Sequence, residues 1–239
     1  MAFDPTKYKP RGIKKLPVLL LLDVSGSMRG EKIINLHDAV VEMINSYVEM
    51  KKRERVIEVA IITFGNSVDL YKKYTSVDEL QKEGIPQFNA NGGTPLGMAL
   101  QMAKDLMEDP DETPRGNYAP AVVLVSDGEP NDEWRGPLDA FIHSGRTQKA
   151  QRFAVAIGVE ADKKMLREFA RSDDAMFYAE NARELAEAFK TISTQSARAP
   201  KAESSMKTAP ARESAPAEVP QTKVSLADDD SADPWMGGE

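Results

Sequence analysis

The chain has 239 residues, of which 41% are hydrophobic and 29% charged, so it can build one sizeable domain and still carry additional sequence. Its net charge of -7 argues against nucleic acid as the main partner. It has no cysteine, which excludes disulfides and thiolate metal sites and favours a reducing compartment, so we expect a cytoplasmic protein.

The first fifteen residues, 1–15, are expected to be irregular, because their prolines and glycine follow no periodicity. The continuous apolar run 16–22 is too short to cross a bilayer and is typical of a strand buried on both faces of a parallel sheet. Basic residues before this run imitate a signal peptide, but Asp23 interrupts it and no small-residue cleavage site follows. We therefore expect neither secretion nor a membrane partner.

Three oxygen-bearing side chains follow this first strand, namely Asp23, Ser25 and Ser27. Alternate residues of an extended turn point the same way, so this spacing can direct one carboxylate and two hydroxyls at one point. Hard oxygen donors of this kind suit magnesium, manganese or calcium. The alternative is that the serines are ordinary turn and helix-capping residues after a core strand.

The next segments alternate between helix and strand. Apolar residues at helical spacing predict an amphipathic helix over 31–52, and an apolar run predicts a second strand over 56–64. We expect residues 67–74 to return as an antiparallel edge strand, because Gly65 and Asn66 permit the positive φ that a tight turn needs. A short polar helix is predicted over 75–83.

A second loop, 89–95, concentrates residues that tolerate unusual backbone angles. It leads into a predicted helix over 96–107, with Thr94 as the N-cap and Pro95 at the first helical position. Capping would account for Thr94 by itself. A metal-ligand role becomes the better hypothesis when the oxygen cluster after the first strand is taken into account.

A third cluster, Ser126 and Asp127, follows an apolar strand predicted over 121–125. The acidic loop 129–133 beside it is expected to be a solvated tip, with support of the metal site or partner contact as the alternative. Further on, helices are predicted over 138–149, 163–171 and 182–191, and strands over 152–159 and 175–178. This alternation predicts an α/β fold with a doubly wound, mostly parallel central sheet, one antiparallel edge strand and helices on both faces.

The segments Asp-Val-Ser-Gly-Ser-Met, Gly-Gly-Thr-Pro and Ser-Asp-Gly together resemble the metal-ion-dependent adhesion site of von Willebrand factor type A domains. The resemblance implies that such a domain spans residues 16–194. It also implies that no residue is catalytic and that a protein partner supplies an acidic residue to a bound divalent cation. Magnesium is the expected ion, with manganese or calcium as alternatives, and the implied ligands are Asp23, Ser25, Ser27, Thr94 and Asp127.

The wider motifs Asn-Gly-Gly-Thr-Pro-Leu-Gly and Ser-Asp-Gly-Glu-Pro are similar to those of the bacterial tellurium-resistance, TerY-type group. That similarity implies an intracellular scaffold in a stress-response complex. A von Willebrand A partner of an AAA-type ATPase is the close alternative. A magnesium-dependent phosphohydrolase using Asp23 is the alternative from another class. It is disfavoured because no second carboxylate follows two residues later and no lysine closely flanks Thr94 or Asp127.

Residues 195–239 are expected to form a disordered, Ala- and Pro-rich acidic tail, because they lack apolar periodicity. Near its end, Asp228, Asp229 and Asp230 precede Trp235, which suggests a recognition element. A separate partner could bind Trp235 as an apolar anchor, or a tail aspartate could occupy the metal position of its own or a neighbouring copy. The remaining alternative is a linker without a binding role.

Overall fold

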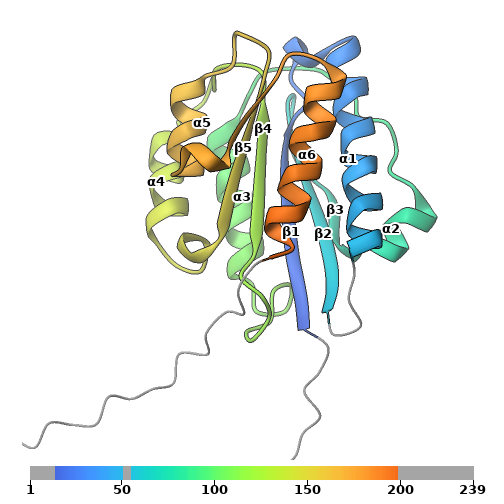
Figure 1. Cartoon of the computed structure of the whole chain (residues 1–239). Helices are drawn as coiled ribbons and strands as arrows, with labels where there is room; N and C mark the ends of the chain where they lie inside the picture. The colour runs from blue at the N-terminus through green and yellow to red at the C-terminus, as the bar shows by residue number, and fades with distance from the viewer. Residues whose placement is uncertain (1–13, 51–54, 199–239) are drawn as a thin grey trace, which may run out of the picture. The chain divides into compact units, whose positions relative to one another are not determined.

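The computed structural model describes residues 14–50 and 55–198. Six strands form one sheet in the order β3-β2-β1-β4-β5-β6, and only the pair β2–β3 is antiparallel (Figure 1). This arrangement confirms the predicted doubly wound, mostly parallel sheet with one antiparallel edge strand. The strands are β1 Lys14–Asp23, β2 Arg55–Phe64, β3 Val68–Ser76, β4 Ala121–Ser126, β5 Gln151–Ile157 and β6 Met176–Ala179.

Helices cover both faces of the sheet (Figure 1). One apolar core lies between the sheet and α1, α2 and α6, and a second core lies between the other face and α3, α4 and α5. The buried strand β1 contributes alternate leucines to the two cores, which is why its apolar run is continuous. The helices are α1 Glu31–Met50, α2 Val77–Glu83, α3 Leu96–Glu108, α4 Arg135–His143, α5 Lys163–Ala170 and α6 Ala182–Ser196.

The turn between β2 and β3 contains Gly65, but for a different reason from the one predicted. Neither Gly65 nor Asn66 has a positive φ, so the expectation of a left-handed turn is wrong. A Cβ on Gly65 would instead lie 2.7 Å from the carbonyl oxygens of both Val24 and Asn91. Glycine therefore lets the hairpin pack directly against the two loops that carry candidate metal ligands.

Several element boundaries differ from the predicted ones. The helix predicted over 138–149 is wrong in its second half, because Gly145 adopts a φ of 66° after α4 and only a short 3-10 turn, Thr147–Lys149, follows. Strand β1 begins two residues earlier than expected, and α6 ends two residues beyond the predicted domain limit of 194. Most of the predicted lead-in and almost all of the predicted tail, with Asp228, Asp229, Asp230 and Trp235, lie outside the described residues.

In the parts of the chain that the structure describes, no helix combines the length and apolar character that a membrane span requires.

Candidate metal site

The candidate ligands gather where β1 and β4 end. Asp23 is the last residue of β1, and Ser126 is the last residue of β4, immediately before Asp127. These strands are parallel neighbours, with Leu22 paired to Val125, so their carboxyl ends reach the same edge of the sheet. In open α/β sheets this edge is where ligands bind.

Asp23 has no solvent exposure and is held by hydrogen bonds to both of its carboxylate oxygens. Its Oδ1 accepts from the backbone N–H of Ser25 at 2.9 Å, and its Oδ2 accepts from the Ser126 hydroxyl at 2.6 Å. Burial raises the pKa of the Asp23 carboxyl, while the hydrogen bonds from Ser126 and Ser25 act to lower it. A cation at this position would offset the cost of keeping the buried carboxylate charged.

The two serines connect the first loop to Asp127. A short 3-10 turn, Gly26–Met28, brings the Ser27 hydroxyl within 2.9 Å of the Ser25 hydroxyl. The Ser27 hydroxyl donates to Asp127 Oδ1 at 2.6 Å. Two of the predicted ligands are thus in contact across 100 residues of chain, and Asp23 is joined to them through the backbone of Ser25.

Thr94 is buried on the second loop, which is fastened to the first by backbone hydrogen bonds. Gly26 donates to the Gly92 carbonyl at 2.9 Å, and Asn91 donates to the Val24 carbonyl at 2.8 Å. The structure therefore brings the Thr94 loop against the Asp23 loop. Among the described residues, however, it gives no hydrogen bond between the Thr94 side chain and the other four predicted ligands.

Thr94 does not cap helix α3, and that part of the prediction is wrong. The helix begins at Leu96, and its first N–H groups are bound by Asp132, whose two carboxylate oxygens accept from Gly97 and Met98 at 3.0 Å each. An acidic side chain from a loop 34 residues or more away thus replaces the expected local cap. The Thr94 hydroxyl therefore does not cap the helix, so capping does not compete with metal binding at this side chain.

The loop that supplies Asp132 also holds Thr94 in place. Asn131 accepts from the Thr94 N–H at 3.1 Å through its side-chain oxygen, and its own N–H donates to the Thr94 carbonyl at 3.1 Å. Glu129 and Glu133 are exposed, as a solvated tip predicts. The loop is therefore part solvated tip and part support for the second candidate metal loop.

Lys32 is a residue of the site that sequence reasoning did not find. Its Nζ lies 2.5 Å from Asp127 Oδ2, and the Asp127 side chain has no solvent exposure. The pair is separated by 95 residues, so proximity in the chain gives no sign of it. The available signal is that Lys32 lies in the first turn of the helix following the Asp23 loop, and such a turn faces the strand ends.

The donor set fits a hard divalent cation. It consists of two carboxylates and three hydroxyls, all oxygen donors of the kind that magnesium, manganese and calcium prefer. The Lys32 ammonium resting on Asp127 indicates that this position favours positive charge. No group of three or more His, Asp or Glu side chains suited to a metal occurs within residues 14–50 and 55–198, so a cation here would depend on the hydroxyls.

The fold matches solved structures of von Willebrand factor type A domains. One is a von Willebrand factor type A protein from Catenulispora acidiphila, at 20% identity and a TM-score of 0.62, covering 77% of this chain and 43% of that one. Another is proximal thread matrix protein 1 from the mussel byssus with a zinc-occupied metal-ion-dependent adhesion motif. It matches at 16% identity and a TM-score of 0.60, and the match covers 75% of this chain and 47% of that one. The vWF domain of the pilus tip protein Mfa5 from Porphyromonas gingivalis matches at 12% identity and a TM-score of 0.57, and the match covers 77% of this chain and 95% of that one.

At these identities the structural matches establish the fold alone, and this chain spans less than half of the first two matched proteins. Sequence gives the family directly. The model of the von Willebrand factor type A domain matches residues 18–191, which is most of the chain and includes all three loops of the candidate site. The chain therefore belongs to the von Willebrand factor type A domain family.

Proposed function

We propose that this protein binds one divalent cation through Asp23, Ser25, Ser27, Thr94 and Asp127 and uses it to capture an acidic residue of a protein partner. The observation that carries the proposal is the convergence of three loops from distant parts of the chain. Ser27 contacts Asp127 directly, and backbone hydrogen bonds tie the Thr94 loop to the Asp23 loop. A magnesium ion suits this all-oxygen set, with manganese or calcium as alternatives.

The charge of the site supports capture of an acid. Two ligand carboxylates balance the charge of one divalent cation, and the hydroxyls add none, so a further carboxylate can approach without like-charge repulsion. Arg29 is exposed on the first loop, where it donates to the Ala90 carbonyl at 3.3 Å and to Asn91 Oδ1 at 3.0 Å. Together with Lys32 it adds positive charge near the strand ends, which would steer an acidic partner toward them.

The metal part of the proposal is tested by calorimetric titration of the full chain with magnesium and with manganese. The variant Asp23→Asn/Asp127→Asn keeps the size of both side chains but removes their charge, and it should lose most of the heat of binding. Asp139→Asn serves as the matched control, because Asp139 lies on α4 with 75% of its side chain exposed. Equal binding by the double variant and the wild type would contradict the proposed site.

The partner part is tested by affinity purification with the wild type and with Asp23→Asn, each in magnesium and in chelator. A partner that depends on the metal should be retained only by the wild type in magnesium. The identity of that partner also decides between an intracellular tellurium-resistance or stress-response scaffold and a companion of an AAA-type ATPase. Magnesium-dependent release of phosphate from a phosphorylated substrate, lost in Asp23→Asn, would favour the phosphohydrolase instead.

A further inference from the structure

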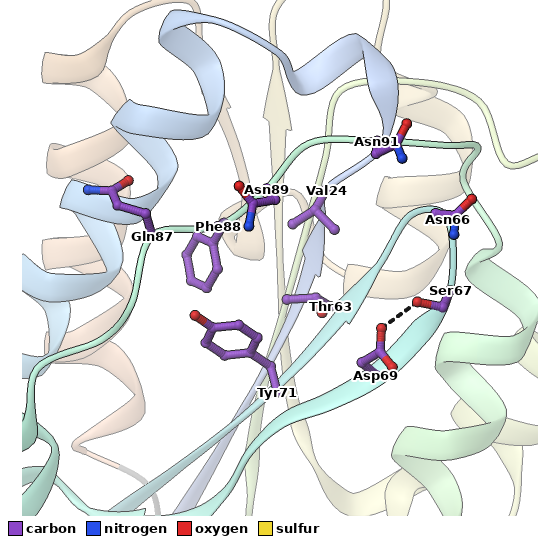
Figure 2. A pocket seen from close by; sticks show the side chains of 10 residues that line it. All are labelled: Val24, Thr63, Asn66, Ser67, Asp69, Tyr71, Gln87, Phe88, Asn89 and Asn91. Carbon is purple, nitrogen blue, oxygen red and sulfur yellow. Dashed lines mark hydrogen bonds between the residues drawn. The ribbon is translucent and has the colours of Figure 1, made fainter.

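A pocket of about 190 Å³ lies directly beside the candidate metal site (Figure 2). It opens between the β2–β3 hairpin and segment 87–91, which leads into the Thr94 loop. Val24, the residue between the candidate ligands Asp23 and Ser25, forms part of its wall. The hairpin contributes Thr63, Asn66, Ser67, Asp69 and Tyr71, and the opposite segment contributes Gln87, Phe88, Asn89 and Asn91.

Aromatic rings form one wall of this pocket. Phe88 is 5% exposed and packs edge-on against Tyr71, with 5.2 Å between the ring centroids. The Tyr71 hydroxyl donates to the Pro86 carbonyl at 2.9 Å, and the His37 ring also packs edge-on against Phe88, with 5.6 Å between the ring centroids. The rings are therefore held in place and offer a fixed apolar and π-rich surface.

The polar lining of the pocket favours a cation. Asp69 is its only charged residue, and no basic side chain lines it. Three carboxamides, from Asn66, Gln87 and Asn89, can provide neutral carbonyl acceptors, whereas the carbonyl of Asn91 already accepts from Arg29 and from the Gly92 N–H. An anion would meet a carboxylate here, whereas a guanidinium or ammonium would meet acceptors, a negative charge and aromatic rings.

The rim of the pocket already binds one guanidinium. Arg29 donates to the amide oxygen of Asn91 at 3.0 Å, so this end of the pocket is already occupied by a cation and a basic ligand would bind at the opposite end, beside Asp69. Asp69 accepts from the Ser67 hydroxyl at 2.5 Å, which orients its carboxylate at the end of the hairpin. Figure 2 shows the Ser67 and Asp69 side chains on the hairpin, joined by this hydrogen bond.

We propose that this pocket receives an arginine or lysine side chain of the same protein partner whose acidic residue binds the metal. The inference rests on the proposed function and adds a second determinant to it. The partner would carry an acid for the cation and a base for Asp69 and the Tyr71–Phe88 wall. Selectivity would then come from the pair of charges, because either charge alone is common on protein surfaces.

The sheet geometry gives the spacing of these two partner residues. Asp23 is aligned with Phe64 on β2, and the neighbouring Thr63 is aligned with Asp69 on β3. Adjacent strands lie about 4.8 Å apart, so the Cα atoms of Asp69 and Asp23 are about 10 Å apart across two strand spacings. An extended peptide rises about 3.3 Å per residue, which places the base about three residues from the acid.

The experiment is selection of short random peptides displayed on phage, using the full-length protein loaded with magnesium. Asp69→Asn is the test variant, since its amide oxygen can still accept the Ser67 hydroxyl, and Asp139→Asn is the control. We expect chelator-sensitive peptides that contain Asp or Glu with Arg or Lys two to four residues away. A synthesised peptide of this class should bind Asp69→Asn about fivefold more weakly than the wild type and the control, the effect of losing one contact of about 1 kcal/mol to the exposed Asp69 carboxylate.

Two other outcomes contradict the inference, and they are distinguishable. If the selected peptides need magnesium and an acid but show no basic residue at this spacing, or bind Asp69→Asn as tightly as the wild type, the pocket has no such role while the proposed function stands. If no selected peptide depends on magnesium, the proposed function fails and the pocket inference fails with it.

Discussion

Replacing Lys32 by methionine tests whether its ammonium acts as a built-in substitute for the metal. The change keeps the length of an unbranched side chain and removes only the charge. Asp127 then loses the Lys32 ammonium group that lies 2.5 Å from its Oδ2. Because the Asp127 side chain has no solvent exposure, water does not replace that group. The metal-free protein should therefore become less stable, while the metal-loaded protein keeps a cation beside Asp127.

The magnitude follows from the geometry of the pair. A hydrogen bond to a charged group contributes about 1.5–3 kcal/mol. The Lys32 side chain is 40% exposed, so solvent screening lowers the expected contribution to about 1–2 kcal/mol. If the ammonium must leave when the cation binds, removing it raises magnesium affinity by the same free energy, about fivefold to thirtyfold.

The assay combines urea unfolding in chelator with calorimetric titration of magnesium, each on the wild type and on Lys32→Met. Lys190→Met, at an exposed position of α6, controls for the change in residue type and net charge. We expect lower stability in chelator together with tighter magnesium binding. Unchanged or weaker magnesium binding would refute the reasoning, because Lys32 would then also hold Asp127 in the metal-loaded protein.

Three further substitutions test the supports of the fold and site. Asp132→Ala should lower the free energy of unfolding by about 1–2 kcal/mol, measured in urea, because it removes the cap of α3. Gly65→Ala should cost about 1–3 kcal/mol in the same assay, since its Cβ would press on two carbonyl oxygens; unchanged stability would contradict this. Burial raises the pKa of Tyr47, so the unfolded tyrosine ionises first and stability should fall as pH rises above about 10. Tyr47→Phe should reduce that fall.

The parts of the fold that sequence predicts well are those with short-range causes. Strands β1 and β4 are continuous apolar runs because helices cover both of their faces, and the same runs mark where the oxygen clusters begin. The close spacing of Asp23, Ser25 and Ser27 follows from their positions in one loop. Their contact with Asp127 depends on β1 lying beside β4, a long-range pairing that the local pattern does not determine.

Most of what the sequence did not predict depends on contacts between residues that are far apart in the chain. Asp132 caps α3 across 34 residues or more, so Thr94 looked like a local cap although it is not one. Lys32 reaches Asp127 across 95 residues, and its role depends on how α1 leaves the first loop. Gly145 is the exception, because its cause is local. The Ser144-Gly145 pair is a signal for the end of a helix, but the prediction gave more weight to the helical spacing of the apolar residues and extended the helix to 149.

The hydrogen-bond network of the site is complete enough to persist without metal. Asp23 is held by Ser25 and Ser126, and Asp127 is held by Ser27 and Lys32, so each buried carboxylate has its own partners. The two cores that stabilise the domain are apolar and lie on the faces of the sheet, whereas the candidate ligands lie at its edge. A cation at this edge therefore contributes little that folding requires. Its main effect would be to add positive charge to these two internally bonded carboxylates, so that the carboxyl end of the sheet attracts an external carboxylate, which is the property that a binding surface needs.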